Sequence, residues 1–112
     1  MKSELLQKKS LHFLGIGGIG MSAIAMVMAK RGHAVSGSDQ NKQTKTMKRL
    51  KQQGIKIFDK QTPENIKEII QRNKKTPIII ISSAINENNE ELKAAKIAEL
   101  EIYHRSDILA NL

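Results

Sequence analysis

Four glycines within six residues constrain the fold of this chain more than any other feature. They occupy residues 15–20, where Gly15, Gly17 and Gly20 fit the spacing G-x-G-x-x-G. A short apolar segment, 11–16, precedes this glycine run, and apolar residues at helical spacing follow it over 19–31. In this context the glycines predict a tight strand-to-helix turn whose backbone can hold a pyrophosphate.

Each glycine of the spacing has an expected role in such a turn. Gly15 permits the tight turn, Gly17 lets a phosphate approach the backbone, and Gly20 lets the helix lie close to the strand. A side chain at Gly17 should block the phosphate and leave the fold largely intact. Tight packing could by itself explain a glycine-rich turn, but it would not require four glycines in six positions.

The rest of the chain alternates between strand and helix patterns. Further strands are expected at 34–38, 55–58, 78–81 and 102–104, and helices at 44–53, from 62 through 70, at 89–99 and from 106 onward. The four isoleucines of 78–81 are typical of a central strand that is buried on both faces. This order predicts an α/β fold, a Rossmann-like open parallel sheet of about five strands with helices on both faces.

Composition excludes several classes of protein. The chain has 112 residues, enough for one domain, and no cysteine, which excludes a disulfide scaffold, a thiolate metal site and a cysteine nucleophile. His12, His33 and His104 lack metal-ligand spacing, so structural roles are expected for them, and we expect no metal site and no catalytic residue. His104, with Arg105, is an exception, because both lie at the carboxyl end of a strand, where a functional site is expected. No segment is apolar enough for a signal peptide or a membrane span, which favours a cytoplasmic protein without a membrane partner.

The net charge of +8 is spread along the chain and forms no basic tract. This distribution favours solvated helix faces over a nucleic-acid surface, so no nucleic-acid partner is expected. A non-enzymatic interaction or nucleic-acid-binding module remains an alternative, as does an NAD-binding domain of a dehydrogenase or regulatory protein, because NAD is a common ligand of this fold.

Other candidate binding residues follow the expected strands. Asp39 ends the second strand, where dinucleotide-binding folds place an acid on a ribose diol, although it could also cap the next segment. Ser82, Ser83 and Asn86 follow the fourth strand and could bind phosphate or sugar oxygens, or only cap the strand. Since ligands bind where the strand order reverses, between the first and fourth strands, this loop should face the glycine run.

Four blocks of sequence resemble the bacterial Mur ligases. They are residues 12–22, 35–39, 82–86 with 89–92, and 104–109, and in the last block the family more often has Glu in place of Asp107. The resemblance covers about 11 to 112. It implies an N-terminal extension at 1–10, a UDP-sugar-binding domain at 11–112, and missing central and C-terminal domains for ATP and the amino acid. The helical pattern that starts near the end of the chain also suggests a piece of a longer protein.

The resemblance implies a role in peptidoglycan biosynthesis. The implied reaction is ATP-dependent addition of L-alanine to the lactyl carboxylate of UDP-N-acetylmuramate through an acyl phosphate. A sister ligase that reattaches recycled murein peptide shares the first block, but residues 18–22 favour the alanine-adding branch. ATP and Mg²⁺ would be bound by the full-length enzyme and no cofactor by this part, which should bind substrate but not catalyse.

The resemblance also implies which residues lie by the UDP-sugar. The glycine run would hold the pyrophosphate, Ser38 and Asp39 would lie by the uridine, and His104 with Arg105 would lie near the nucleoside side. Ser82, Ser83 and Ala84 would lie by the pyrophosphate or the sugar. The full expected set is Gly15, Gly17, Gly18, Ile19, Gly20, Met21, Ser38, Asp39, Ser82, Ser83, Ala84, His104 and Arg105.

Overall fold

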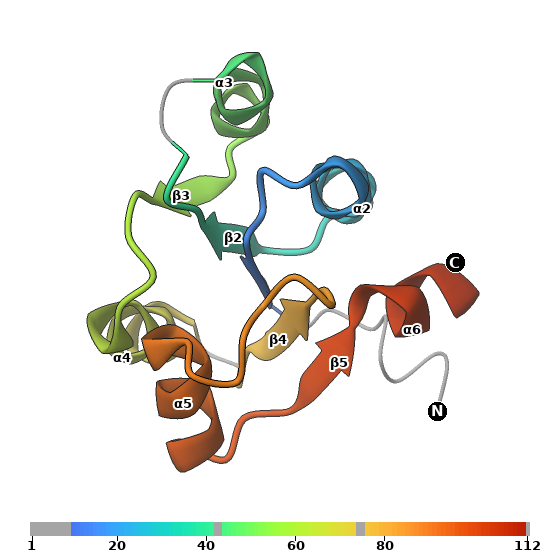
Figure 1. Ribbon diagram of the computed structural model, residues 1–112. Helices are drawn as coiled ribbons and strands as arrows, with labels where there is room; N and C mark the ends of the chain where they lie inside the picture. Colours follow the sequence, from blue (N-terminus) through green and yellow to red (C-terminus); the bar gives the residue numbers. More distant parts are fainter. Residues whose placement is uncertain (1–9, 42–43, 74–75, 112) are drawn as a thin grey trace.

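The computed structural model describes residues 10–41, 44–73 and 76–111. Within them, parallel strands form one sheet in the order β3-β2-β1-β4-β5 (Figure 1). The strands are β1 (Leu11–Leu14), β2 (Val35–Ser38), β3 (Lys56–Phe58), β4 (Ile78–Ile81) and β5 (Ile102–His104). The strand order reverses between β1 and β4, so the predicted Rossmann-like open sheet is confirmed.

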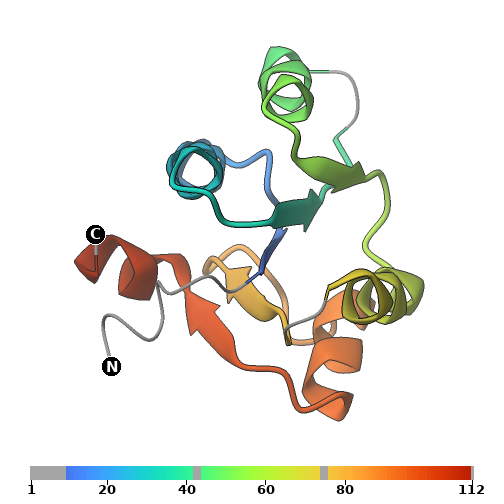
Figure 2. The same cartoon turned by 180° about the vertical axis from the view of Figure 1, so that it is seen from behind.

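Helices cover both faces of this sheet, as expected. They are α2 (Ile19–Lys30), α3 (Lys45–Gln52), α4 (Pro63–Arg72), α5 (Glu90–Ile97) and α6 (Arg105–Ala110). Helices α2, α3 and α6 lie on one face, and α4 and α5 lie together on the other (Figures 1 and 2). Each helix from α2 to α5 connects two parallel strands, which places the loops that follow the strands at one edge of the sheet.

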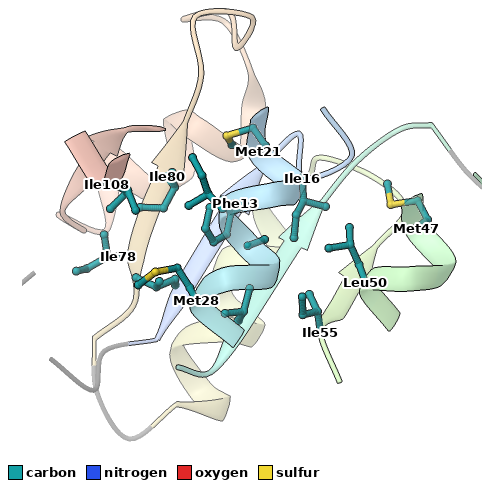
Figure 3. Close-up of a cluster of buried hydrophobic side chains, with 14 residues drawn as sticks. Phe13, Ile16, Met21, Met28, Met47, Leu50, Ile55, Ile78, Ile80 and Ile108 are labelled. Carbon is teal, nitrogen blue, oxygen red and sulfur yellow. The ribbon is translucent and has the colours of Figure 1, made fainter. Parts of the chain in front are cut away.

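Alternating side chains of the strands form two apolar clusters. Phe13 and Ile80 point toward α2 and α6, where they meet Met28 and Ile108 (Figure 3). Leu14 lies on the opposite face, in the cluster that packs beneath α4 and α5. His12 lies on that second face and is fully buried there. A polar imidazole ring therefore occupies a position where the alternation of the strand would place an apolar core side chain.

The observed ends of helices and strands agree with the expected ones to within two residues. The first strand ends at Leu14 rather than at 16, because Gly15 adopts φ 76° and turns the chain. The amides of Gly15 and Ile16 then both donate to the carbonyl oxygen of Ser38, at 2.8 and 3.0 Å. The glycine run is therefore bonded directly to the end of β2.

The ends of the chain are described only in part. Residues 1–9 of the expected N-terminal extension lie outside the described residues, and Ser10 is the first residue of the described chain. None of the helices in the described ranges is long and apolar enough to cross a bilayer.

Candidate nucleotide-binding site

The glycine run is the meeting point of segments that follow four strands. A Cβ added to any of its three spaced glycines would reach a residue of another segment at the carboxyl edge of the sheet. The distances are 3.3 Å to Cδ1 of Ile85 from Gly15, 2.8 Å to Oδ2 of Asp39 from Gly17, and 3.2 Å to Nη1 of Arg105 from Gly20. The structure thus brings together the loops after β1, β2, β4 and β5, as expected from the strand order.

Asp39 holds the middle of the glycine run. Its Oδ2 accepts a hydrogen bond from the N–H of Gly17 at 2.8 Å, and its Oδ1 accepts one from the N–H of Asn41 at 2.9 Å. The carboxylate is 9% exposed and lies where a Cβ of Gly17 would otherwise point. Gly17 is therefore required for the contact with Asp39.

The N-terminus of α2 offers hydrogen-bond donors to an anion. Gly18 is the N-cap residue and has no side chain to accept from the helix, and the first turn contains no acidic residue. The first turn closes with the N–H of Ser22 donating to the carbonyl of Gly18 at 2.9 Å. The amides of Ile19, Gly20 and Met21 consequently lack an intrahelical acceptor and carry the positive end of the helix dipole.

Arg105 adds a full positive charge at the same place. His104 caps α6 by a capping box, in which its Nδ1 accepts from the N–H of Ser106 and its own N–H donates to Asp107 at 2.9 Å. This cap starts α6 directly after β5 and sets Arg105 against Gly20. Gly20 thus makes room for a guanidinium, whereas the sequence suggested only close packing of helix and strand.

Two positive groups therefore lie together at this edge. Among the described residues no carboxylate forms an ion pair with Arg105, although the guanidinium lies beside the positive end of α2. Such an arrangement is unfavourable without a negative partner and becomes favourable when an anion binds between the charges. The electrostatics of the site therefore favour an anion over a cation or a neutral group.

The loop after β4 is shaped by its own polar side chains. The hydroxyl oxygen of Ser82 accepts from the N–H of Ala84 at 3.3 Å, and the Asn86 side chain accepts from the N–H of Asn88 at 2.7 Å. Ser83 and Ala84 are exposed at the same edge as the glycine run. The loop ends at Asn89, whose side chain caps α5 by accepting from the N–H of Leu92 at 3.0 Å.

Ser38 differs from the other expected site residues because its side chain faces the interior. It is fully buried, and its hydroxyl donates to Oε1 of Glu91 at 2.5 Å. Oε2 of Glu91 lies 2.6 Å from Nε2 of His12 and accepts from Asn65 at 3.1 Å. Glu91 and Asn65 were not candidates from the sequence, where an acid in the first turn of a helix signals only a favourable dipole contact.

A metal site and a cavity are the other kinds of site to consider. Within the described ranges, no three His, Asp or Glu side chains gather where they could hold a metal ion. A cavity of about 250 Å³ opens at the opposite edge of the sheet, where residues that precede β2 and β3 line it, among them His33 and Gly54. That cavity lies at the amino ends of the strands and is separate from the glycine run.

The parallel sheet, the glycine run at the reversal of strand order and the uncapped helix end define a Rossmann-like domain of the kind that holds phosphate groups. Residues 10–112 match the model of a family described as "Mur ligase family, catalytic domain". The chain belongs to the Mur ligase family.

Curated relatives agree with this assignment. Over all 112 residues the chain is 47% identical to the UDP-N-acetylmuramate–L-alanine ligase of Prochlorococcus marinus (strain MIT 9303), of which it covers 23%. It is 45% identical, again over its full length, to the enzyme of the same name from Parasynechococcus marenigrum, of which it covers 24%. The chain therefore spans about a quarter of the length of the curated relatives it matches.

Solved structures of other proteins share this fold. The UDP-N-acetylmuramate–alanine ligase of Thermotoga maritima matches 89% of this chain with a TM-score of 0.75 and 30% identity, and the match covers 21% of that enzyme. The UDP-N-acetylmuramate:L-alanyl-gamma-D-glutamyl-meso-diaminopimelate ligase of Neisseria meningitides matches 91% of this chain, and the match covers 30% of that enzyme with a TM-score of 0.80. At 22% identity the second match shows likeness of fold alone.

Proposed function

We propose that this chain is the UDP-sugar-binding part of an ATP-dependent ligase that adds L-alanine to UDP-N-acetylmuramate in peptidoglycan precursor synthesis. The family and the names of the relatives support this proposal. The observation that carries it is the uncapped N-terminus of α2 beside the guanidinium of Arg105. Together they form a site for a pyrophosphate, which is the charged centre of a UDP-sugar.

The pyrophosphate would bind to the first turn of α2. The amides of Ile19, Gly20 and Met21 would donate to its oxygens, and each such contact contributes about 0.3–1 kcal/mol when exposed and up to about 2 when partly buried. Gly18 and Gly20 have no side chains to obstruct the approach. The family resemblance implied a place for Arg105 near the nucleoside. Because Arg105 lies beside Gly20, we place it at the pyrophosphate instead.

The two sides of the pyrophosphate would meet different segments. Asp39, at the end of β2, lies on the side where the uridine would bind, and Ser38 contributes there through the backbone because its hydroxyl is buried. The exposed residues Ser83 and Ala84 would lie by the sugar, with Ser82 holding their loop in shape. His104 would act through the capping box that places Arg105.

The proposed reaction needs groups that longer relatives supply. ATP would phosphorylate the lactyl carboxylate to an acyl phosphate with release of ADP, and the amine of L-alanine would then displace the phosphate. ATP, Mg²⁺ and L-alanine would be bound by the rest of a full-length ligase, since this chain covers about a quarter of its relatives. The part described here would hold the sugar nucleotide.

Calorimetry on the 112-residue chain tests the binding proposal. UDP-N-acetylmuramate and UDP should each give saturable heat with one site, and NAD should give none under the same conditions. Saturable heat with NAD and none with UDP-N-acetylmuramate would instead identify an NAD-binding domain and overturn the proposal.

A further inference from the structure

A buried group of polar side chains lies below the glycine run, on the face of the sheet that α4 and α5 cover. We propose that Glu91 and His12 at its centre are a positioning pair, which fixes the glycine run so that the α2 amides are ordered before the ligand arrives. The identity of that ligand, a uridine diphosphate group, rests on the proposed function. The ordering of the loop itself does not.

Glu91 is a carboxylate without access to water. It is 0% exposed, although it lies in the first turn of α5 beside the exposed Glu90. Its two oxygens are surrounded by three groups: the Ser38 hydroxyl at 2.5 Å, the Asn65 side-chain amide at 3.1 Å and Nε2 of His12 at 2.6 Å. Burial of a carboxylate is unfavourable unless it is hydrogen-bonded in this way, so the groups around residue 91 are arranged to accommodate a buried acid.

His12 joins the carboxylate to the centre of the sheet. It is 0% exposed and lies in β1, and its Nδ1 is 2.7 Å from the hydroxyl of Ser36 in β2. The hydrogen bonds are all satisfied when Nε2 donates to Glu91 and Nδ1 accepts from Ser36. The ring of Phe58 in β3 packs edge-on against the imidazole, with 5.8 Å between centroids. The pair thereby links α5 to three neighbouring strands.

Ser38 transmits this arrangement to the glycine run. Its hydroxyl is bonded to Glu91, while its carbonyl accepts from the amides of Gly15 and Ile16. The next residue, Asp39, accepts from the amide of Gly17. Three consecutive amides of the glycine run therefore depend on the end of β2, and the rotamer of its last residue depends on Glu91.

This arrangement has a consequence for the ligand. The amides at 15–17 are used to hold the loop, so they are not available to a phosphate. The amides that remain are those of the first turn of α2, and their direction is set by the loop that leads into the helix. A looser connection between Glu91 and Ser38 should therefore weaken phosphate binding without any loss of a direct contact.

Amide hydrogen exchange by NMR on the 112-residue chain tests the ordering. Glu91→Gln keeps the size of the side chain but replaces one accepting oxygen by an NH₂ group that cannot accept from Ser38, Asn65 or His12. We expect the amides of Gly15 and Ile16 to exchange roughly tenfold faster, while the amides of β4 exchange as in the parent. Ser38→Ala should reproduce this local pattern.

The neighbouring acid provides the control. Glu90→Gln changes an exposed carboxylate in the same turn of α5 and should leave all these rates unchanged. Parent-like exchange at Gly15 and Ile16 in Glu91→Gln would overturn the proposal. So would a uniform acceleration across the whole sheet, because that is the result of general structural support.

The ligand arm uses UDP as the probe. If the parent binds UDP, Glu91→Gln should bind it roughly tenfold more weakly, because one charge-assisted hydrogen bond that holds Ser38 beneath the glycine run is lost. Glu90→Gln should bind UDP as the parent does. Faster exchange with unchanged UDP affinity would overturn the link to the ligand. A parent that binds neither UDP nor UDP-N-acetylmuramate would sink the proposed function, while the exchange rates would still decide whether Glu91 orders the loop.

Discussion

At the scale of single residues, the missing side chain of a glycine makes room for particular neighbouring atoms. Gly37 in β2 shows this outside the glycine run, since a Cβ there would lie 2.5 Å from Cδ1 and 2.6 Å from Cβ of Ile16. Ile16 is fully buried and follows the turn at Gly15. The absence of a side chain at residue 37 thus lets the glycine run pack onto the sheet, which the spacing of residues 15–20 does not reveal.

Gly17 should be sensitive to the smallest possible side chain. In Gly17→Ala the new Cβ would lie 2.8 Å from Oδ2 of Asp39 and 3.0 Å from Cε of Met47, so both must move. We expect a loss of about 1–3 kcal/mol in the free energy of unfolding, as for other overpacked sites. This outcome differs from the sequence-based expectation that a side chain here leaves the fold largely intact.

Urea denaturation measures this difference, and Gly18→Ala is its control. A Cβ at Gly18 would meet only ordinary contacts, the nearest at 3.4 Å, so the loss should stay below about 1 kcal/mol, the cost of a poorer N-cap. Equal losses in the two variants would show that Asp39 does not restrict residue 17.

Arg105 should matter for ligand affinity and little for stability. In Arg105→Lys the charge remains, but a guanidinium that can form two parallel hydrogen bonds with a phosphate is lost. We expect UDP to bind roughly tenfold more weakly by calorimetry. Arg31→Lys, an exposed arginine at the other end of α2, should bind UDP as the parent does, and equal affinities in the two variants would remove Arg105 from the site.

At the scale of elements, the helices that frame the site begin with different caps. Asn89 caps α5 through its side chain and also donates to Gln61 at 3.1 Å. Thr62 stands at the same position of α4, but its side chain forms no capping bond. The expected helix from 62 through 70 thus begins with Thr62 as N-cap and Pro63 as first helical residue, but without a capping hydrogen bond. Helix α5 therefore depends more on its cap, and it carries Glu91 in its first turn.

This difference predicts unequal effects of two similar substitutions. Asn89→Ala should lower the free energy of unfolding by about 1 kcal/mol, the usual cost of a lost N-cap, with a range of about 0.5–2. Thr62→Ala should cost less, because no capping bond is lost. Thermal and urea denaturation of both variants measure the difference, and a larger loss in Thr62→Ala would contradict this account of the two helix starts.

At the scale of the whole molecule, elements were predictable and contacts between them were not. The strands 78–81 and 102–104 have the predicted bounds, and the reversal between β1 and β4 was expected, because periodicity and turn residues are local properties of the sequence. The contact of Gly20 with Arg105 and the pair of His12 with Glu91 join residues 85 and 79 positions apart. Such pairs depend on how helices pack across the sheet, and no local pattern encodes them.

The two edges of the sheet offer two different places where a ligand could bind. The carboxyl edge has the uncapped helix end and the guanidinium of Arg105. The amino edge has the cavity of about 250 Å³, with His33, Gly54 and Asn73 in its lining. The cavity offers room for a ligand at the amino edge, whereas charge and free donors favour an anion at the carboxyl edge.

Titration of the isotope-labelled chain with UDP separates these alternatives within one molecule. The amide signals of Ile19, Gly20 and Met21 should shift most, because their N–H groups would donate to the phosphates, and signals of Ser83 and Arg105 should shift with the same affinity. The amides of His33, Gly54 and Asn73 should remain in place and serve as the internal control. Shifts confined to these three would transfer the binding site to the amino edge, and the glycine run would then be explained by its packing on β2 alone.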